Sequence, residues 1–578
     1  MLRRVSALFS LILLSGCTTI GNDVDELQKR LSMARADAQT NAAADDYGQF
    51  LVARYASLTN DPGQAAENYA HVALSQPGDR SIVDRAVFSA LLADRFDLAR
   101  SIASNVSKKA DTQSPLASMT LATDALAKAR YADVPGLLED SDPGIFDTLI
   151  FTTLRAWALF GEGDTARAQL TLLEASSGDA YLDSLLLNML AIMEVATGND
   201  AAAVKTFSKL ESSGTLIAHG AVSYAQLLSA EGLDQEAKEI LENFRANAGP
   251  NPLITGLQRR LEQGETLSAH RPDTQEGAAL SIYIPAAALA SRTQTDLPGV
   301  YYALALHLDP DLNAARALWA DALDRAGRHT EAIAKLEEIP ESSPYYSGAR
   351  GQLAWAFLRS GDNARALELV QHTLAGQPER DLRIQMGDLL QSLDREEEAV
   401  DVFSGIIEDD RASGEQDWRL YYTRGALRER MGLWPSAEQD LKTAKSLNPH
   451  APEVLNYLGY SWIDRGMNLE EGLELVRKAL TLRPDSGEIT DSLGWAHYRL
   501  GNIDQSISYL ERAVELKPGL AEINEHLGDA YWAAGRRTEA RYQWQRAMSL
   551  LEADDEIERL RRKSLTGPVN LPPALQNP

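Results

Sequence analysis

An internal repeat of 34 residues constrains the fold of this chain more than any other feature of its sequence. Leu493-Gly494 recurs as Leu527-Gly528, 34 residues later. Alanines and prolines recur at the same interval, namely Ala513 and Ala547, and Pro484 and Pro518. A fixed period of this length is typical of arrays in which no unit buries its apolar face alone, so neighbouring units must stack. The repeat therefore outweighs the length of 578 residues, which alone would suggest about four separate domains.

One segment shows the pattern in full. Residues 487–520 (GEITDSLGWAHYRLGNIDQSISYLERAVELKPGL) resemble the tetratricopeptide repeat. The resemblance implies two antiparallel amphipathic helices, with small residues such as Gly494 and Ala513 where the helix backbones approach closely. Pro518 is expected to end the second helix, because the residue before a proline is disfavoured in the α conformation.

The period continues upstream with weaker motifs. Ala168, Ala203 and Ala237 follow one another at intervals of 35 and 34 residues. Residues 251–311 fit the period poorly, and no strand-like alternation interrupts the helical pattern. We therefore expect an all-α fold, a right-handed superhelical solenoid of about 12–14 helix pairs.

The first seventeen residues, MLRRVSALFSLILLSGC, have the layout of a secretory signal. Two arginines precede an apolar run that is shorter than the about 20 residues needed to span a bilayer as a helix. The last four residues, Leu14 to Cys17, resemble the lipobox of bacterial lipoproteins. The resemblance implies that Cys17 is lipidated, with acyl chains such as palmitate. Thr18, in place of an aspartate, implies by the same analogy a position in the outer membrane, facing the periplasm.

These patterns divide the chain into six expected parts. Residues 1–16 form a lipoprotein signal peptide, and residues 17–45 form the lipidated cysteine with a polar tether. The repeats follow as residues 46–250, degenerate and N-terminal, residues 251–311, an irregular central helical unit, and residues 312–553, the C-terminal array. Residues 554–578 form a polar cap helix and a proline-rich tail, because the open end of a solenoid needs a polar cover.

Composition and charge exclude several classes of function. The net charge is −27, so the chain repels nucleic-acid phosphates and is not expected to bind nucleic acid. Cys17 is the only cysteine, which leaves no internal disulfide, no CxxC redox pair and no thiolate zinc site. Asp309-x-Asp311-x-Asn313 begins like a calcium loop, but alanine stands at its sixth and twelfth positions. We find no catalytic, metal or cofactor motif and expect that the protein is not an enzyme.

The resemblance to tetratricopeptide repeats places candidate binding residues on the first helix of each pair, which lines a concave groove in that family. The positions concerned in the last four units carry eight acids, three arginines and five aromatic residues. They are Arg419, Tyr422, Glu429, Arg430, Glu453, Asn456, Tyr460, Ile463, Asp464, Glu488, Asp491, Trp495, Tyr498, Arg499, Glu522, Glu525, Asp529 and Trp532.

Two interpretations of this set remain open. Exposed aromatic residues are typical anchors for a bound protein, and we take Tyr422, Tyr460, Trp495, Tyr498, Arg499 and Trp532 as the candidate groove. The same tyrosines and tryptophans are equally consistent with packing in the core. An acidic groove would favour a basic partner segment.

The closing series LNYLGYSWIDRG, LRPDSGEITDSLGWAHYRLG and HLGDAYWAAGRRTEA, together with the lipobox, is similar to large outer-membrane tetratricopeptide lipoproteins. Some of these are adaptors that bind periplasmic carboxyl-terminal processing proteases and their substrates, often cell-wall hydrolases. The resemblance implies a non-enzymatic scaffold for other envelope proteins, anchored in the membrane through lipid. One alternative is an assembly factor for outer-membrane, export or secretion machinery, and a remote one is a cell-wall hydrolase.

Overall fold

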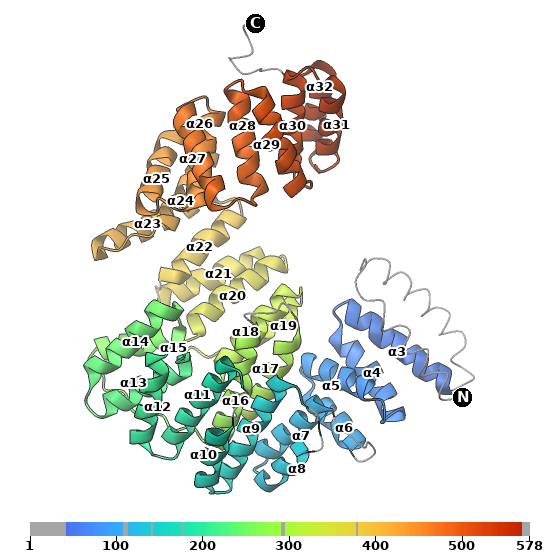
Figure 1. Ribbon diagram of the computed structural model, residues 1–578, viewed down its shortest axis with the longest axis vertical. Coiled ribbons are helices and arrows are strands. Elements are labelled where there is room, and N and C mark those ends of the chain that lie inside the picture. Colours follow the sequence, from blue (N-terminus) through green and yellow to red (C-terminus); the bar gives the residue numbers. More distant parts are fainter. Residues whose placement is uncertain are drawn as a thin grey trace. The chain divides into compact units, whose positions relative to one another are not determined.

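In the computed structural model, stacked helices make up most of the described part of the chain (Figure 1). The structure describes residues 42–107, 114–139, 141, 143–175, 178–290, 295–376 and 380–568. Over these residues it contains α-helices and one short 3-10 helix, and no β-strand. The expected all-α fold of stacked helix pairs is therefore confirmed. Among the described helices, none has both the length and the apolar composition that a membrane span requires.

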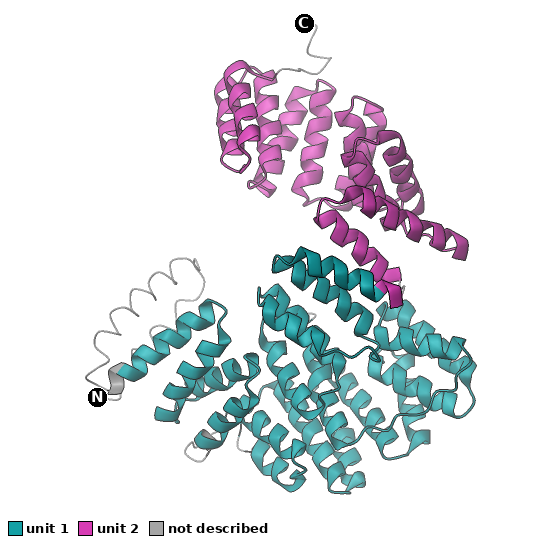
Figure 2. Ribbon diagram, turned by 180° about the vertical axis from the view of Figure 1, so that it is seen from behind, with its two compact units in different colours: residues 1–373 teal, residues 374–578 magenta. Residues whose placement is uncertain are grey.

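The chain divides into two compact units, residues 1–373 and 374–578 (Figure 2). This division reflects compactness, whereas the expected boundaries at residues 250 and 311 were drawn from the regularity of the repeat and stay a prediction. The signal peptide, Cys17, the tether up to residue 41 and the tail from residue 569 lie outside the described residues.

Unit 1 is built mainly of antiparallel helix pairs. Its helices are α3 (Ala42–Leu58), α4 (Pro62–Ser75), α5 (Arg80–Leu92), α6 (Phe96–Ser107), α7 (Pro115–Ala127), η1 (Tyr131–Asp133), α8 (Val134–Glu139), α9 (Ile145–Gly161), α10 (Thr165–Glu174), α11 (Ala180–Ala196), α12 (Asp200–Ser212), α13 (Ala218–Ala230), α14 (Asp234–Ala248), α15 (Pro252–Glu262), α16 (Thr274–Ala290), α17 (Leu297–Leu308), α18 (Asn313–Arg325), α19 (His329–Glu337), α20 (Tyr346–Arg359) and α21 (Asn363–Gly376), which runs across the division.

Two helices of unit 1, α16 and α17, pair with each other and also fill its interior. α16 is apolar on all sides, and α16 and α17 pack against α5, α7, α9 and α11, the first helices of four N-terminal pairs (Figure 1). Tyr301 of α17 donates a hydrogen bond to Asp147 of α9 at 2.8 Å. A Cβ atom on Gly277 of α16 would overlap the indole of Trp157. The inner side of these pairs is thus occupied by the chain itself.

Unit 1 also closes on itself through contacts between distant parts of the sequence. The side-chain amide of Asn60 donates to the carbonyl of Ala326 at 2.8 Å. The guanidinium of Arg328 donates to the carbonyl of Leu92 at 3.0 Å. These bonds tie the turns beside α18 and α19 to the first helix pairs of the same unit.

Unit 2 is the more regular array. Its helices are α22 (Arg380–Ser392), α23 (Glu396–Ser413), α24 (Trp418–Arg430), α25 (Trp434–Leu447), α26 (Pro452–Asp464), α27 (Leu469–Leu482), α28 (Gly487–Arg499), α29 (Ile503–Leu516), α30 (Ala521–Ala533), α31 (Arg537–Met548) and α32 (Asp554–Thr566).

The small residues of the repeat lie where the two helices of a pair touch. A Cβ atom on Gly494 of α28 would stand 2.6 Å from Cγ of Leu510 in α29. A Cβ atom on Gly528 of α30 would stand 2.5 Å from Nε1 of Trp544 in α31. Only glycine leaves room for this approach, which explains why the position recurs.

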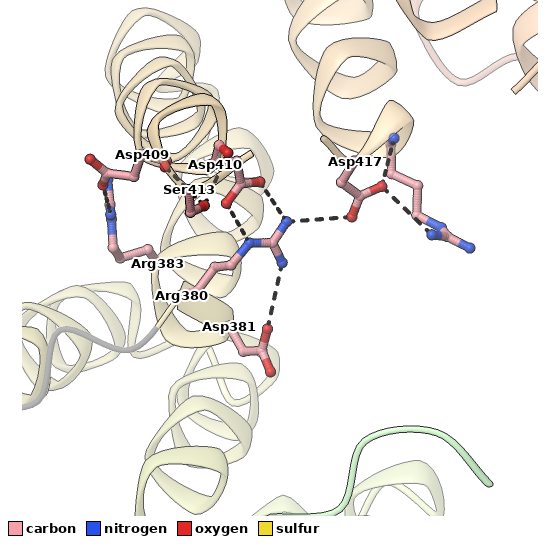
Figure 3. Close-up of polar contacts among 8 residues, drawn as sticks. Arg380, Asp381, Arg383, Asp409, Asp410, Ser413 and Asp417 are labelled. Atoms are coloured by element: carbon pink, nitrogen blue, oxygen red, sulfur yellow. Dashed lines mark hydrogen bonds and ion pairs between the residues drawn. The ribbon is translucent and has the colours of Figure 1, made fainter. Parts of the chain in front are cut away.

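A cluster of ion pairs holds the first helices of unit 2 together (Figure 3). The Arg380 guanidinium donates to both carboxylate oxygens of Asp410 at 2.9 and 2.8 Å, and a nitrogen lies 3.6 Å from Asp417. These contacts join α22 to α23 and to the start of α24. The hydrogen bond to buried Asp410 raises the pKa of Arg380, so the guanidinium stays charged.

Candidate protein-binding surface

The first helices of the last pairs in unit 2 form a continuous row. α26 contacts α28, and α28 contacts α30, in addition to the contacts of each helix with its own partner. The hydroxyl of Tyr460 in α26 donates to Glu522 of α30 at 2.9 Å, although α28 stands between these helices in the row. The row is therefore curved. We call the side of α24, α26, α28 and α30 that carries the candidate residues the inner face.

Trp495, on α28, stacks against two other rings. Its indole stacks on Tyr498 at a centroid distance of 4.7 Å and on His526 of α30 at 4.2 Å. Tyr498 is only 2% exposed, and burial raises the pKa of its hydroxyl. Tyr498 thus belongs to the core, whereas Trp495 is half-buried.

Tyr422 and Tyr460 are half-buried on neighbouring helices. The ring of Tyr422 meets Tyr457 edge to face at 5.7 Å. Tyr457 also donates to Glu429 at 3.3 Å. Tyr457 was absent from the sequence-based set because the family's groove positions skip it, although it directly follows Asn456, which is in that set.

Arg499 and Trp532 lie elsewhere on the row. Arg499 donates to the carbonyl of Asp464 at 2.6 Å, which occupies it within the chain. Trp532, at the end of α30, contacts the Arg537 guanidinium, 3.8 Å from the ring centroid, and the backbone of Gly567. The structure therefore brings Trp495 and Tyr498 into direct contact and places Trp532 at the edge, against α31 and the end of α32.

Every one of the eight acids on the inner face has a partner within the chain. Seven pair with a cation, and Glu522 accepts the hydrogen bond from Tyr460. The ion pairs are Glu429 with Arg465, Glu453 with Arg483, Asp464 with Arg499, Glu488 with Lys517, Asp491 with His526, Glu525 with Arg559 and Lys563, and Asp529 with Lys563. The expected acidic field is thus largely neutralised, and the electrostatic argument for a basic partner loses its support.

The most buried of these pairs joins neighbouring first helices. Nδ1 of His526 lies 2.9 Å from Asp491 of α28. Burial lowers the pKa of His526, but the charge and hydrogen bond of Asp491 raise it further, to about 9. His526 is therefore cationic at neutral pH and also supports the ring of Trp495.

The cap helix covers the end of the inner face. Arg559 of α32 donates to both carboxylate oxygens of Glu525 at 2.7 and 2.8 Å, and Lys563 lies 2.7 Å from Asp529. Burial raises the pKa of Glu525, but Arg559 and Lys563 lower it to about 2. In each ion pair the two residues are 34 positions apart in the sequence, which is one repeat. α32 therefore occupies the place of the first helix of a further repeat. That spacing is the signal by which the sequence could have revealed the contact.

Within the described residues, no group of three or more His, Cys, Asp and Glu side chains could hold a metal ion. What the inner face offers is an aromatic surface of four half-buried rings, Tyr422, Tyr457, Tyr460 and Trp495, among paired charges.

Comparison with known proteins agrees with this description of the fold. Residues 492–550 match the tetratricopeptide repeat family. A TPR repeat-containing protein of Pseudomonas aeruginosa is 30% identical over 148 residues, which cover 25% of this chain and 24% of that protein. The chain therefore spans about a quarter of that relative's length.

Solved structures with a similar arrangement share little sequence with this chain. The Cut9–Hcn1 hetero-tetramer of the APC/C is 15% identical and covers 93% of this chain and 98% of its own, with a TM-score of 0.38. A thermophilic TPR protein of Thermus thermophilus is 21% identical and covers 32% of this chain and 99% of its own, with a TM-score of 0.29. The family match shows tetratricopeptide repeats in residues 492–550 of the chain.

Proposed function

We propose that this protein is a non-enzymatic scaffold that binds other proteins on the inner face of unit 2. The observation that carries the proposal is the row of half-buried aromatic rings on α24, α26 and α28, whose neighbouring acids are largely paired. Aromatic side chains bury a large area at a small entropic cost and commonly anchor protein interfaces. Tetratricopeptide repeats also suggest a scaffold for protein interaction.

The location belongs to the same proposal. Cys17, in a lipobox-like sequence, would carry the lipid that anchors the chain in the outer membrane, facing the periplasm. Anchoring would confine bound envelope proteins to that surface and raise their local concentration. Replacing the cysteine, Cys17→Ser, should release the protein from the membrane fraction. Retention of the variant there would count against lipidation.

The specific role that we propose is an adaptor bringing a periplasmic carboxyl-terminal processing protease together with substrates such as cell-wall hydrolases. It is supported by the resemblance of the closing repeats and the lipobox to such adaptors. The purified soluble form should accelerate degradation of a cell-wall hydrolase by the protease from the same organism. Unchanged degradation, with no protease co-purifying, would remove this role and leave an assembly factor as the next candidate.

Capture of envelope proteins by tyrosine variants tests the inner face. Tyr422→Ala combined with Tyr460→Ala should reduce the amount of partner recovered from solubilised envelopes about tenfold or more, as expected for loss of two anchors. Tyr542→Ala is the matched control, because Tyr542 lies on the second helix α31 and is 70% exposed. Equal recovery by both variants, with unchanged circular dichroism, would place the binding site elsewhere.

A further inference from the structure

The described part of the chain ends in contact with α30, the first helix of the last pair in the array. α32 ends at Thr566, and Gly567 adopts a φ of 83°, a conformation that favours glycine. Gly567 is buried, and a Cβ atom there would overlap the indole of Trp532 in α30. The residue that follows α32 therefore lies against α30, and the described chain ends one residue later.

Ion pairs fix this exit point. Arg559 and Lys563 hold α32 against Glu525 and Asp529 of α30. Lys563 is 16% exposed and the Asp529 side chain 7% exposed, so the contact is largely shielded from water and salt. The described chain therefore ends next to α30, at the end of the row that forms the inner face.

The segment that follows has a composition unlike the rest of the chain. Residues 569–578 read VNLPPALQNP, with three prolines, two leucines and no charged residue, whereas 24% of all residues are charged. Proline-rich segments favour the extended polyproline II conformation and dock in grooves lined by aromatic side chains. A segment without charged side chains also suits a surface whose acids are already paired, because its docking does not separate the paired charges.

The length of the segment matches the inner face. Ten residues in polyproline II conformation extend about 31 Å, and neighbouring packed helices lie about 8–10 Å apart. The segment can therefore reach from α30 past α28 to α26. The hydrogen bond between Tyr460 and Glu522 shows that α26 and α30 approach each other on this side.

We propose that residues 569–578 dock in an extended conformation on the inner face of their own chain, over Trp495 and Tyr460, and compete there with partner proteins. The inference rests on the proposed function, because it takes the inner face to be a protein-binding surface. The segment acts as an intramolecular occupant that a partner must displace.

Binding of a fluorescent peptide of residues 569–578 tests this proposal. The peptide should bind a chain that ends at Pro568 at least about tenfold more tightly than the full chain, because a tethered segment competes at an effective concentration in the millimolar range. The full chain with Leu571→Asp and Leu575→Asp should bind the peptide as the shortened chain does. Leu565→Asp is the matched control: this leucine is 73% exposed on α32 and precedes the segment, so the variant should behave as the full chain does.

The position of docking is tested on the shortened chain. Tyr460→Ala should weaken peptide binding about fivefold or more, as expected for loss of one aromatic anchor, whereas Tyr542→Ala should leave it unchanged. A photoreactive group on the peptide at the position of Leu575 should crosslink to α26 or α28. Equal binding to the shortened and full chains, no binding to either, or crosslinks confined to unit 1 would each overturn the proposal.

Two further outcomes separate this inference from the proposed function. The photoreactive group placed at residue 575 of the full chain should crosslink within one chain, and crosslinks between two copies would overturn docking on the own chain. If the peptide fails to bind while Tyr422→Ala and Tyr460→Ala abolish partner capture, the inference falls and the function stands. If the peptide binds as expected and no envelope protein is captured, the proposed function falls instead.

Discussion

Glycines at the contact between paired helices set the geometry of the array at the scale of single residues. At Gly494 and Gly528 the neighbouring helix leaves no space for a methyl group. At Gly348, in α20, a Cβ atom would meet nothing within 4 Å. The two environments predict opposite effects of the same substitution.

Gly494→Ala should lower the free energy of unfolding by about 1–3 kcal/mol, because overpacking against Leu510 exceeds the gain in helix propensity. Gly348→Ala should raise it by about 0.5–1 kcal/mol, because alanine favours the helix and finds open space. Urea denaturation followed by circular dichroism measures both. A stabilising Gly494→Ala would show that the helices of this pair do not approach as closely as described.

The ion pair of His526 and Asp491 makes the stability of the fold depend on pH in the neutral to alkaline range. The pKa of His526 rises from 6.5 to about 9 on folding. The folded state therefore binds the proton more tightly, so this stabilisation is fully present below about pH 6.5 and is lost as the pH rises through about 9. The melting temperature should fall across this range, and Asp491→Asn should flatten that part of the profile. An equal slope in the variant would assign the pH dependence to other groups.

Among the helices, α32 completes the array because it occupies the place that the first helix of another repeat would have. Arg559 and Lys563 of α32 are four residues apart, and so are Glu525 and Asp529 of α30. Each cation of α32 can therefore pair with one acid of α30. Leu560 is fully buried between these contacts and supplies the apolar anchor. α32 is therefore part of the fold and sets where the following segment begins.

Removing the lysine should loosen this end of the chain. Lys563→Met leaves buried Asp529 without its cation and should cost about 2–4 kcal/mol, close to the range for breaking a buried ion pair. Arg562→Met is the control, since Arg562 lies outside this contact and its change should stay within about 0.5 kcal/mol. Hydrogen exchange of α30 to α32 reports the difference. Similar protection in both variants would mean that the apolar contacts alone hold α32.

The sequence predicted these elements unevenly, for physical reasons. α28 and α30 follow from the repeat, because Gly494 and Gly528 mark contacts within one pair. The filling of unit 1 by α16 and α17 did not follow, since an apolar helix reveals that it is buried but not against which helices. The pairing of Glu488 with Lys517, and of Asp491 with His526, depends on how successive repeats stack, which the groove positions alone do not specify.

In the molecule as a whole, the two units differ in what lies against the first helices of their pairs. In unit 1 the first helices of four pairs pack on α16 and α17, so their inner side is occupied by the chain. In unit 2 the row of α24, α26, α28 and α30 carries half-buried aromatic rings instead. Partner binding is therefore expected on unit 2, and a supporting role on unit 1.

Crosslinking of a captured envelope protein to the full chain, mapped by mass spectrometry, tests this assignment most directly. Crosslinked residues should gather on α24, α26, α28 and α30, and Tyr422→Ala with Tyr460→Ala should remove these crosslinks. Crosslinks gathered on unit 1, or on the second helices α25, α27, α29 and α31, would contradict it.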